Sequence, residues 1–269
     1  MNFKKSKFVN EIGEITQNMY RQGWNERNGG NISMLITEQE IKPYLRKLKP
    51  IRNFELTAHF PELEGKYFLI TGTGKYFKNV YKSPEECLGL IKITNNGATA
   101  ELLWGFNDGG RYTSEVTMHL ASHKTRLAID PNHRIVMHAH PVNTICMTHI
   151  VKWDNLTFTR ALWGTCTECV VIFPEGVAVL PWMVSSSDSI GLVSAEMFKD
   201  YRILVWGIHG IIATGTSIDE AFGLIETVEK AAEIFMKTDL HTIKNKLSDK
   251  DLLGVVDAFG LTVKEGWLK

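Results

Sequence analysis

The chain has 269 residues, 44% of them hydrophobic and 22% charged, which is enough apolar sequence to bury the core of one large domain or two modest ones. Thirty basic residues balance thirty acidic ones, so the net charge favours neither nucleic acid nor an anionic membrane as a partner. No apolar run is long enough to span a membrane, no signal peptide is evident, and the four cysteines fit a reduced, cytoplasmic protein.

The first predicted element is an amphipathic helix over residues 8–22, with apolar side chains at helical spacing and Gly23 suited to its end. A glycine-rich turn, Arg27-Asn28-Gly29-Gly30-Asn31-Ile32-Ser33, then leads into an expected strand. Its glycines permit positive φ and bring backbone N–H groups near a ligand, while Asn28 and Asn31 add amide donors. The pattern suits a phosphate, and a tight helix-to-strand turn is the alternative.

Residues 38–66 are polar and mixed, which indicates an excursion over the surface. A strand at 67–70 follows and runs into a second glycine-rich turn, Thr71-Gly72-Thr73-Gly74-Lys75. This turn lacks the spacing of a Walker loop, but its hydroxyls and N–H groups can still wrap a small anion. Further on, Asn95-Asn96-Gly97 between two apolar runs predicts a β-hairpin.

A helix is predicted over about 116–128, directly after Thr113-Ser114-Glu115. Thr113 or Ser114 can cap this helix, and the free N–H groups of its first turn favour an anion. Glu115 is therefore expected near donors that suit a phosphate. A negative charge in the first turn stabilises a helix, but this effect explains the presence of Glu115 only in part.

The same helix carries His119 and His123, whose spacing allows two metal ligands on one helix face. Because His123 falls in the apolar stripe of the helix, we favour structural or supporting roles for both. Downstream, Cys166-Thr167-Glu168-Cys169 has no second cysteine pair to complete a zinc site. We interpret residues 169–173 as a buried strand that a hairpin joins to a strand at 177–180.

Residues 134–139 form an apolar, β-branched strand that His140-Pro141 closes. Alternation along a strand puts His138 and His140 on the same face, where two neighbouring imidazoles are costly to bury without a partner. A divalent metal is such a partner because neutral imidazole nitrogen is a favoured zinc ligand, although an H-x-H pair is by itself weakly specific. Another strand, 203–208, delivers a third histidine, His209.

Helices interspersed with hairpins, without strict strand–helix alternation, predict an α/β fold: a three-layer α/β/α sandwich with a central mixed, largely antiparallel sheet. We expect a single domain over residues 1–269. Apolar residues at helical spacing predict a helical tail at about 241–269, after a long helix that begins near Thr216 and Ser217.

Five of these segments occur in the order that is found in the class II aldolase/adducin family. The chain resembles this family from about residue 8 to about residue 240, nearly its whole length. The shared segments are Asn28-Gly29-Gly30-Asn31, Thr71-Gly72-Thr73-Gly74-Lys75, Thr113-Ser114-Glu115, His138-Ala139-His140 and His209-Gly210. Each motif alone is weakly specific, but five in register are together strongly specific.

The resemblance implies a role for each of these residues. His138, His140 and His209 would hold one Zn²⁺ and leave positions open for substrate oxygens. Glu115 would be the general acid/base, and Glu168 would reach the active site of a neighbouring subunit, because relatives assemble as homotetramers. The phosphate of a small sugar substrate would be bound by Asn28, Gly30, Asn31, Thr73, Gly74 and Ser114.

The activity implied is cleavage of a ketose 1-phosphate, in which Zn²⁺ stabilises the enediolate of dihydroxyacetone phosphate and no lysine Schiff base is needed. Overall likeness favours L-rhamnulose 1-phosphate, which would give dihydroxyacetone phosphate and L-lactaldehyde. The alternatives are cleavage of L-fuculose 1-phosphate, a pentulose-phosphate 4-epimerase and a non-catalytic, adducin-like scaffold. The epimerases usually carry aspartate where this chain has Glu115, and scaffold domains lose the metal ligands that are present here.

Overall fold

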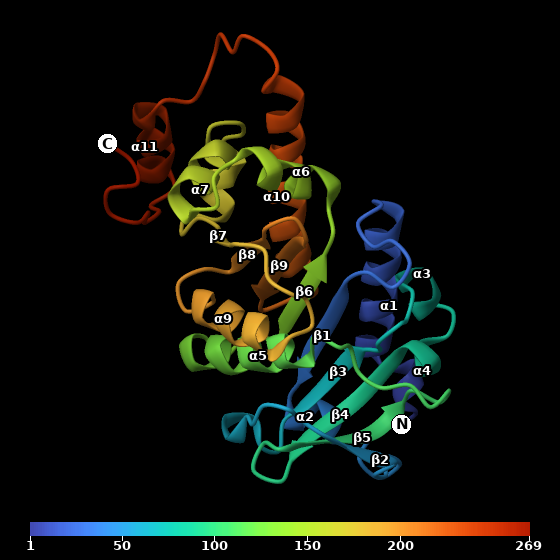
Figure 1. The fold of residues 1–269 in the computed structure, drawn as a ribbon. Helices are drawn as coiled ribbons and strands as arrows, with labels where there is room; N and C mark the ends of the chain where they lie inside the picture. The colour runs from blue at the N-terminus through green and yellow to red at the C-terminus, as the bar shows by residue number, and fades with distance from the viewer.

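A computed structural model describes residues 1–269, and it is organised around one nine-stranded sheet (Figure 1). Neighbouring strands are antiparallel except β7 and β8, which are parallel, so the predicted mixed, largely antiparallel sheet is confirmed. The strand order is β2-β5-β4-β3-β1-β6-β9-β8-β7. The strands are β1 (Asn31–Ile36), β2 (Arg52–Glu55), β3 (Tyr67–Thr71), β4 (Leu88–Thr94), β5 (Thr99–Gly105), β6 (Ile135–Ala139), β7 (Ala178–Leu180), β8 (Ile203–Trp206) and β9 (Gly210–Gly215).

Helices cover both faces of this sheet (Figure 1). The helices are α1 (Lys7–Arg21), α2 (Glu38–Ile41), α3 (Phe77–Val80), α4 (Pro84–Cys87), α5 (Val116–Ile129), α6 (Val142–Ile150), α7 (Asn155–Trp163), α8 (Glu168–Ile172), α9 (Asp188–Met197), α10 (Ile218–Thr238) and α11 (Asp249–Ala258), with 3-10 turns at Phe3–Lys5 and Pro61–Leu63.

The alternation of side chains along each strand separates the core into two layers. On β1, Ile32 and Met34 belong to a buried cluster that includes the apolar faces of α1 and α10. Leu35 points to the opposite face, where it belongs to a cluster with Leu120 of α5. A further cluster joins β6, β8 and β9 to α5 and α9 on that second face. The predicted three-layer α/β/α sandwich is therefore confirmed.

Two predictions that were based on turn chemistry, the end of α1 and the β4–β5 hairpin, are confirmed. Gly23 has a positive φ of 77° just after α1, which Ser6 caps at its start. Asn95, Asn96 and Gly97 all have positive φ between β4 and β5, as a tight hairpin turn requires.

The interpretation of residues 169–173 as a strand is wrong, because they lie almost entirely in helix α8. Cys169 and Val170 are both buried while Ile172 is exposed, a one-sided pattern that fits a helical turn rather than alternation. A short apolar run does not distinguish a strand from a buried helix. The predicted hairpin is consequently absent, and β7 instead pairs in parallel with β8.

The predicted cap of α5 is also wrong. The N-cap position is Glu115, and neither Thr113 nor Ser114 makes a side-chain cap bond to the first turn. The helix begins at Val116, as predicted, but the residues before it are held against the sheet: Tyr112 forms an isolated bridge with Gly72, and the Thr113 N–H donates to the Thr71 carbonyl. The segment therefore follows the sheet as far as Thr113 before the helix begins.

Two regions outside the central strands complete the fold. Residues 38–66 contain the short helix α2 and strand β2, which pairs with β5 at the edge of the sheet. Residues 241–269 contain α11, which lies near α7 and the C-terminus (Figure 1). No helix of the structure has the length and apolar composition that crossing a membrane demands.

Candidate active site

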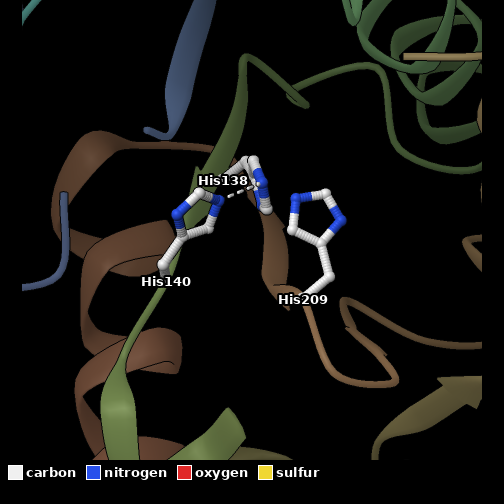
Figure 2. A group of neighbouring side chains, drawn as sticks. All are labelled: His138, His140 and His209. Carbon is white, nitrogen blue, oxygen red and sulfur yellow. Dashed lines mark hydrogen bonds between the residues drawn. The ribbon is translucent and has the colours of Figure 1, made fainter. Parts of the chain in front are cut away.

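The end of β6 places His138 and His140 side by side (Figure 2). His138 donates from Nδ1 to the Ile211 carbonyl over 2.9 Å, and His140 donates from Nδ1 to the Glu26 carboxylate at 3.1 and 3.2 Å. In a neutral ring bonded in this way Nε2 is unprotonated, and the Nε2 atoms of the two rings are 3.1 Å apart. The lone pairs of two unprotonated nitrogens this close repel each other unless a shared proton or a metal ion lies between them.

The turn between β8 and β9 brings His209 to the same point (Figure 2). Its preceding residue, Ile208, has a positive φ of 56° and donates its N–H to Thr148 Oγ1 of α6 over 2.9 Å. The His209 ring stacks on the Trp206 indole, with ring centroids 5.0 Å apart. Helix α6 and the end of β8 thus fix the third imidazole from two sides.

The three imidazoles have the geometry and protonation state of metal ligands. One ring nitrogen from each lies within 4.8 Å of the other two. Burial lowers the pKa of His138 well below its ordinary value and that of His209 to about 4, so these rings are neutral at pH 7. Neutral imidazole nitrogens that converge on one point fit a divalent metal ion.

Glu115 lies beside this histidine cluster. Its Oε2 is 3.8 Å from His138 Nε2 and accepts a 2.8 Å hydrogen bond from Asn31 Nδ2. Burial raises the pKa of Glu115, an effect that the hydrogen bond from Asn31 and the proximity of His140 partly oppose. A buried carboxyl with a raised pKa is suited to exchange a proton with a substrate.

Strand pairing assembles the remaining groups around the histidines. Asn31 lies directly opposite His138 across the β1–β6 pair, and β3 borders β1 on its other side. Both glycine-rich turns therefore meet at the same end of these strands. Together they enclose a cavity of about 160 Å³. It is lined by Asn28, Gly29, Gly30, Asn31, Gly72, Thr73, Gly74, Thr113, Ser114, Glu115, His138, His140, Ser186 and His209. Every predicted site residue except Glu168 is among them.

Neutral donors line the part of this cavity formed by the glycine-rich turns. Gly30 has a φ of 75°, and a Cβ there would lie 1.8 Å from Asn25 Nδ2, so only glycine fits. The backbone N–H groups of Gly30 and Gly74 have no acceptor within the chain, whereas that of Thr73 donates to the Arg111 carbonyl. Thr73 therefore offers only its hydroxyl. No lysine or arginine lines the cavity, so an anion would be held by neutral N–H and O–H groups.

Glu168 lies elsewhere. Its side chain is exposed at the start of α8 and accepts a 2.7 Å hydrogen bond from the Cys166 thiol, which lowers the pKa of the carboxyl. It borders a different cavity, shared with Trp24, Asn143 and Glu229. Glu168 therefore does not line the histidine-containing cavity of its own chain.

Two residues of the site, Ser186 and Glu26, carry no clear signal in the sequence. Ser186, which has a positive φ of 61°, lines the cavity and forms a 2.9 Å hydrogen bond with Ser114. Its only signal is a run of three serines, a composition that is common in surface loops. Glu26 accepts the hydrogen bond that orients His140, and nothing in its local pattern distinguishes it from other acidic residues before a turn.

As expected, His119 and His123 lie outside the ligand set. The only group of three or more histidine, cysteine or acidic residues with metal-ligand spacing is His138, His140 and His209. His119 instead contacts Asn31 and Ser33, and His123 contacts Ser33 from the same helix.

The chain is similar to known proteins over most of its length. The family model described as "Class II Aldolase and Adducin N-terminal domain" matches residues 10–236. A rhamnulose-1-phosphate aldolase of Enterococcus faecalis is 46% identical over 100% of this chain and 97% of its own length, and one of Listeria monocytogenes is 45% identical over 97% and 96%. The crystal structure of a sugar-phosphate aldolase from Thermotoga maritima superposes with a TM-score of 0.75 at 25% identity, covering 88% of this chain and 97% of the other.

The family match spans most of the chain, and the sequence relatives span nearly all of it. The structural neighbour shows that the fold is shared as well. The chain therefore belongs to the class II aldolase and adducin family.

Proposed function

We propose that the chain reversibly cleaves L-rhamnulose 1-phosphate to dihydroxyacetone phosphate and L-lactaldehyde, as a carbon–carbon lyase of L-rhamnose catabolism. Relatives named rhamnulose-1-phosphate aldolase, 40–46% identical over nearly the full chain, support this assignment. The observation that carries it is the single cavity in which three converging imidazoles, a buried carboxyl and a set of anion donors meet.

Class II aldolases depend on a metal, and the donor set of three converging imidazoles supports one here. We propose that this metal is Zn²⁺, because nitrogen ligands and an open coordination position suit a catalytic zinc site. When bound, the metal supplies Lewis-acid stabilisation of the negative charge that develops on the substrate oxygens.

The residues of the chain would divide the remaining work. The hydroxyls of Thr73 and Ser114, the amides of Asn28 and Asn31 and the backbone N–H groups of the two turns would hold the phosphate, which fixes the reacting bond relative to Glu115. Cleavage between C3 and C4 requires the C4 hydroxyl to lose its proton, which would pass to the ionised Glu115; the aldehyde is released and an enediolate is left. Glu115 then delivers a proton to C3 of this intermediate, which becomes dihydroxyacetone phosphate, and in the reverse direction Glu115 removes that proton.

We further propose a homotetramer in which Glu168 serves the active site of a neighbouring subunit. This placement is supported by the exposure of Glu168 and by its position outside the lining of the histidine-containing cavity of its own chain. We assign the reaction to the cytoplasm, a reducing compartment that suits four free cysteines.

The test is a two-sugar cleavage assay. Release of dihydroxyacetone phosphate is measured from L-rhamnulose 1-phosphate and L-fuculose 1-phosphate, with and without a chelator, followed by added Zn²⁺. We expect faster release from L-rhamnulose 1-phosphate, loss of activity with the chelator and recovery with zinc. Full activity in metal-free protein would reject the mechanism, and a preference for the fuculose substrate would reject the substrate assignment.

A further inference from the structure

A buried hydrogen-bond network reaches Glu115 from the core. Asn31 donates from Nδ2 to the Glu115 carboxylate over 2.8 Å, and Asn31 Oδ1 lies 2.5 Å from His119 Nε2. His119 Nδ1 in turn lies 2.7 Å from Ser33 Oγ. His119 and Ser33 are at most 1% exposed, so each hydrogen bond is made in a medium that excludes water.

The network continues away from the site through two more histidines. Ser33 Oγ lies 2.8 Å from His123 Nε2, and His123 Nδ1 lies 3.0 Å from His133 Nε2. Both of these histidines are also at most 1% exposed. The spacing of the partners on β1 and α5 matches, because two residues along a strand and four along a helix both advance by about 6–7 Å. Alternate residues of β1 therefore meet successive turns of α5.

Each bond in this network has a direction that the chemistry fixes. An ionised Glu115 can only accept, so Asn31 must present its amide nitrogen to it and its carbonyl oxygen to His119. His119 is neutral, because burial lowers its pKa to about 3. Since it must donate from Nε2 to Asn31, its Nδ1 is unprotonated and accepts from the Ser33 hydroxyl. Ser33 in turn accepts from His123, and every proton in the network points toward Glu115.

We propose that His119 is a positioning residue for the lyase reaction: held in its Nε2–H tautomer by Ser33, it fixes the orientation of the Asn31 amide and thereby the Glu115 carboxylate. The proposal rests on the proposed function of Glu115. Without the donor on His119, the Asn31 amide is free to rotate by half a turn and to present its carbonyl oxygen to the carboxylate, which repels it. Oε2 would then lose the bond that holds it beside His138.

The geometry also shows which atom of Glu115 the network leaves available. Only Oε2 is hydrogen-bonded to another side chain, and Glu115 itself lines the cavity. Asn31 thus anchors one oxygen, and Oε1 is the oxygen with no protein partner, so it remains available to the substrate. A precise carboxylate position matters because proton transfer falls off steeply with misplacement of the acid or base.

The test compares two substitutions that each keep half of the imidazole. His119→Gln retains an N–H near the position of Nε2 and so can still donate to Asn31, whereas His119→Asn reaches only Ser33. We expect kcat for L-rhamnulose 1-phosphate cleavage to fall at least about tenfold in His119→Asn, with a smaller change in KM and wild-type zinc content, and to recover largely in His119→Gln. Wild-type kcat in His119→Asn, or equal loss in the two folded variants, would overturn the proposal.

Two further variants keep the test decisive if His119→Asn does not fold. Ser33→Ala leaves the His119 ring in place but removes the donor that selects its tautomer, so we expect kcat to fall about threefold or more. Wild-type kcat in Ser33→Ala would overturn the proposal. Thr16→Val is the matched control: it removes a buried hydroxyl on α1 that bonds only to backbone carbonyls, and its kcat should not change.

The wild-type protein in the same assay separates the two claims. If it releases no dihydroxyacetone phosphate, the proposed function fails. If it does and the His119 variants behave alike, only the positioning role fails.

Discussion

Glu115 is the residue whose replacement separates chemistry from metal binding. In Glu115→Gln the amide keeps the volume of the carboxyl but cannot accept and return a proton. We expect kcat to fall by about 10²–10⁴, the usual contribution of general acid–base catalysis. Zinc content should stay at the wild-type level, because all three imidazoles remain. Elemental analysis of the same sample is the control, and turnover near wild type would remove Glu115 from the mechanism.

The buried histidines of α5 and its neighbour His133 predict a pH dependence of stability. Burial lowers the pKa of His119 and His133 to about 3 and that of His123 well below its ordinary value of about 6.5. Below about pH 6.5 these histidines bind protons in the unfolded chain but not in the folded one. The stability that they contribute is therefore fully present above that pH and is lost as the pH decreases toward 3. Each histidine contributes a slope of up to about 1.4 kcal/mol per pH unit.

His133→Gln removes one of these groups while keeping an N–H donor for His123. We therefore expect its free energy of unfolding to fall less than that of the wild type between about pH 7.5 and about pH 5.5. Urea unfolding at the two pH values measures this, with a chelator in every sample so that the metal ligands titrate alike. An equal slope in both proteins would show that His133 is not held neutral.

At the scale of single residues, the sequence identified groups with a strong chemical signal. Two histidines on one strand face, and asparagines beside glycines, are residue types that metal and anion sites require. Glu26 and Ser186 have no such signal, because their roles depend on contacts with His140 and Ser114 across the fold. Asn31 was predicted only as a phosphate ligand, and its contacts with Glu115 and His119 could not be read from the chain.

Among the elements, α6 has the most direct link to the site, since it begins two residues after His140. Its N-cap residue is Pro141, which makes no cap bond, and the buried carboxylate of Glu229 on α10 takes over this role. Glu229 accepts from the backbone N–H groups of Asn143 and Thr144 at 3.0 and 2.8 Å, and from both of their side chains.

Glu229→Gln places an amide N–H against these donors. We expect the free energy of unfolding to fall by about 1–3 kcal/mol, because buried donors lose their acceptor. Glu226→Gln, an exposed substitution on the same helix, is the matched control and should change stability by less than about 0.5 kcal/mol. Urea unfolding measures the free energy of unfolding of both variants, and equal stability of the two would contradict the capping role.

Elements with a clear period or turn signal were predicted correctly from the sequence, and those set by tertiary contacts were not. The first helix and the hairpin with Asn95-Asn96-Gly97 depend on local spacing and turn chemistry. Residues 169–173 are apolar and β-branched, yet packing against α10 and α11 makes them a helix. The start of α5 at Val116 was predicted correctly, but its cap was not, because a bridge between Tyr112 and Gly72 holds the preceding segment in a strand-like conformation.

For the whole molecule, strand order is the feature that local patterns cannot supply. The site exists because β1 lies between β3 and β6. This order brings the two glycine-rich turns and the histidine-bearing end of β6 together at the same end of these central strands. Pairing between strands far apart in sequence leaves no local signature. The family resemblance predicted that these segments meet, and the sheet topology gives the physical reason.

The proposed homotetramer makes a prediction about mixed subunits. If Glu168 acts in a neighbouring subunit, a Glu115→Gln chain and a Glu168→Gln chain can together form an intact site that neither forms alone. We expect both pure variants to be nearly inactive, and a refolded equal mixture to regain about a quarter of wild-type activity in a cyclic assembly with random order.

The specific comparison is between that mixture and the average of the two pure variants. Activity no greater than this average would place Glu168 outside the catalytic site. Unchanged activity of pure Glu168→Gln would have the same meaning.

The measurement that tests the central claim most directly is a zinc titration of metal-free protein. Bound zinc and release of dihydroxyacetone phosphate from L-rhamnulose 1-phosphate are followed together in the wild type and in His209→Ala. We predict that wild-type activity rises in proportion to bound zinc and reaches its plateau at one ion per chain, while His209→Ala binds zinc far more weakly. Activity that is independent of bound zinc, or tight stoichiometric binding without His209, would contradict the account.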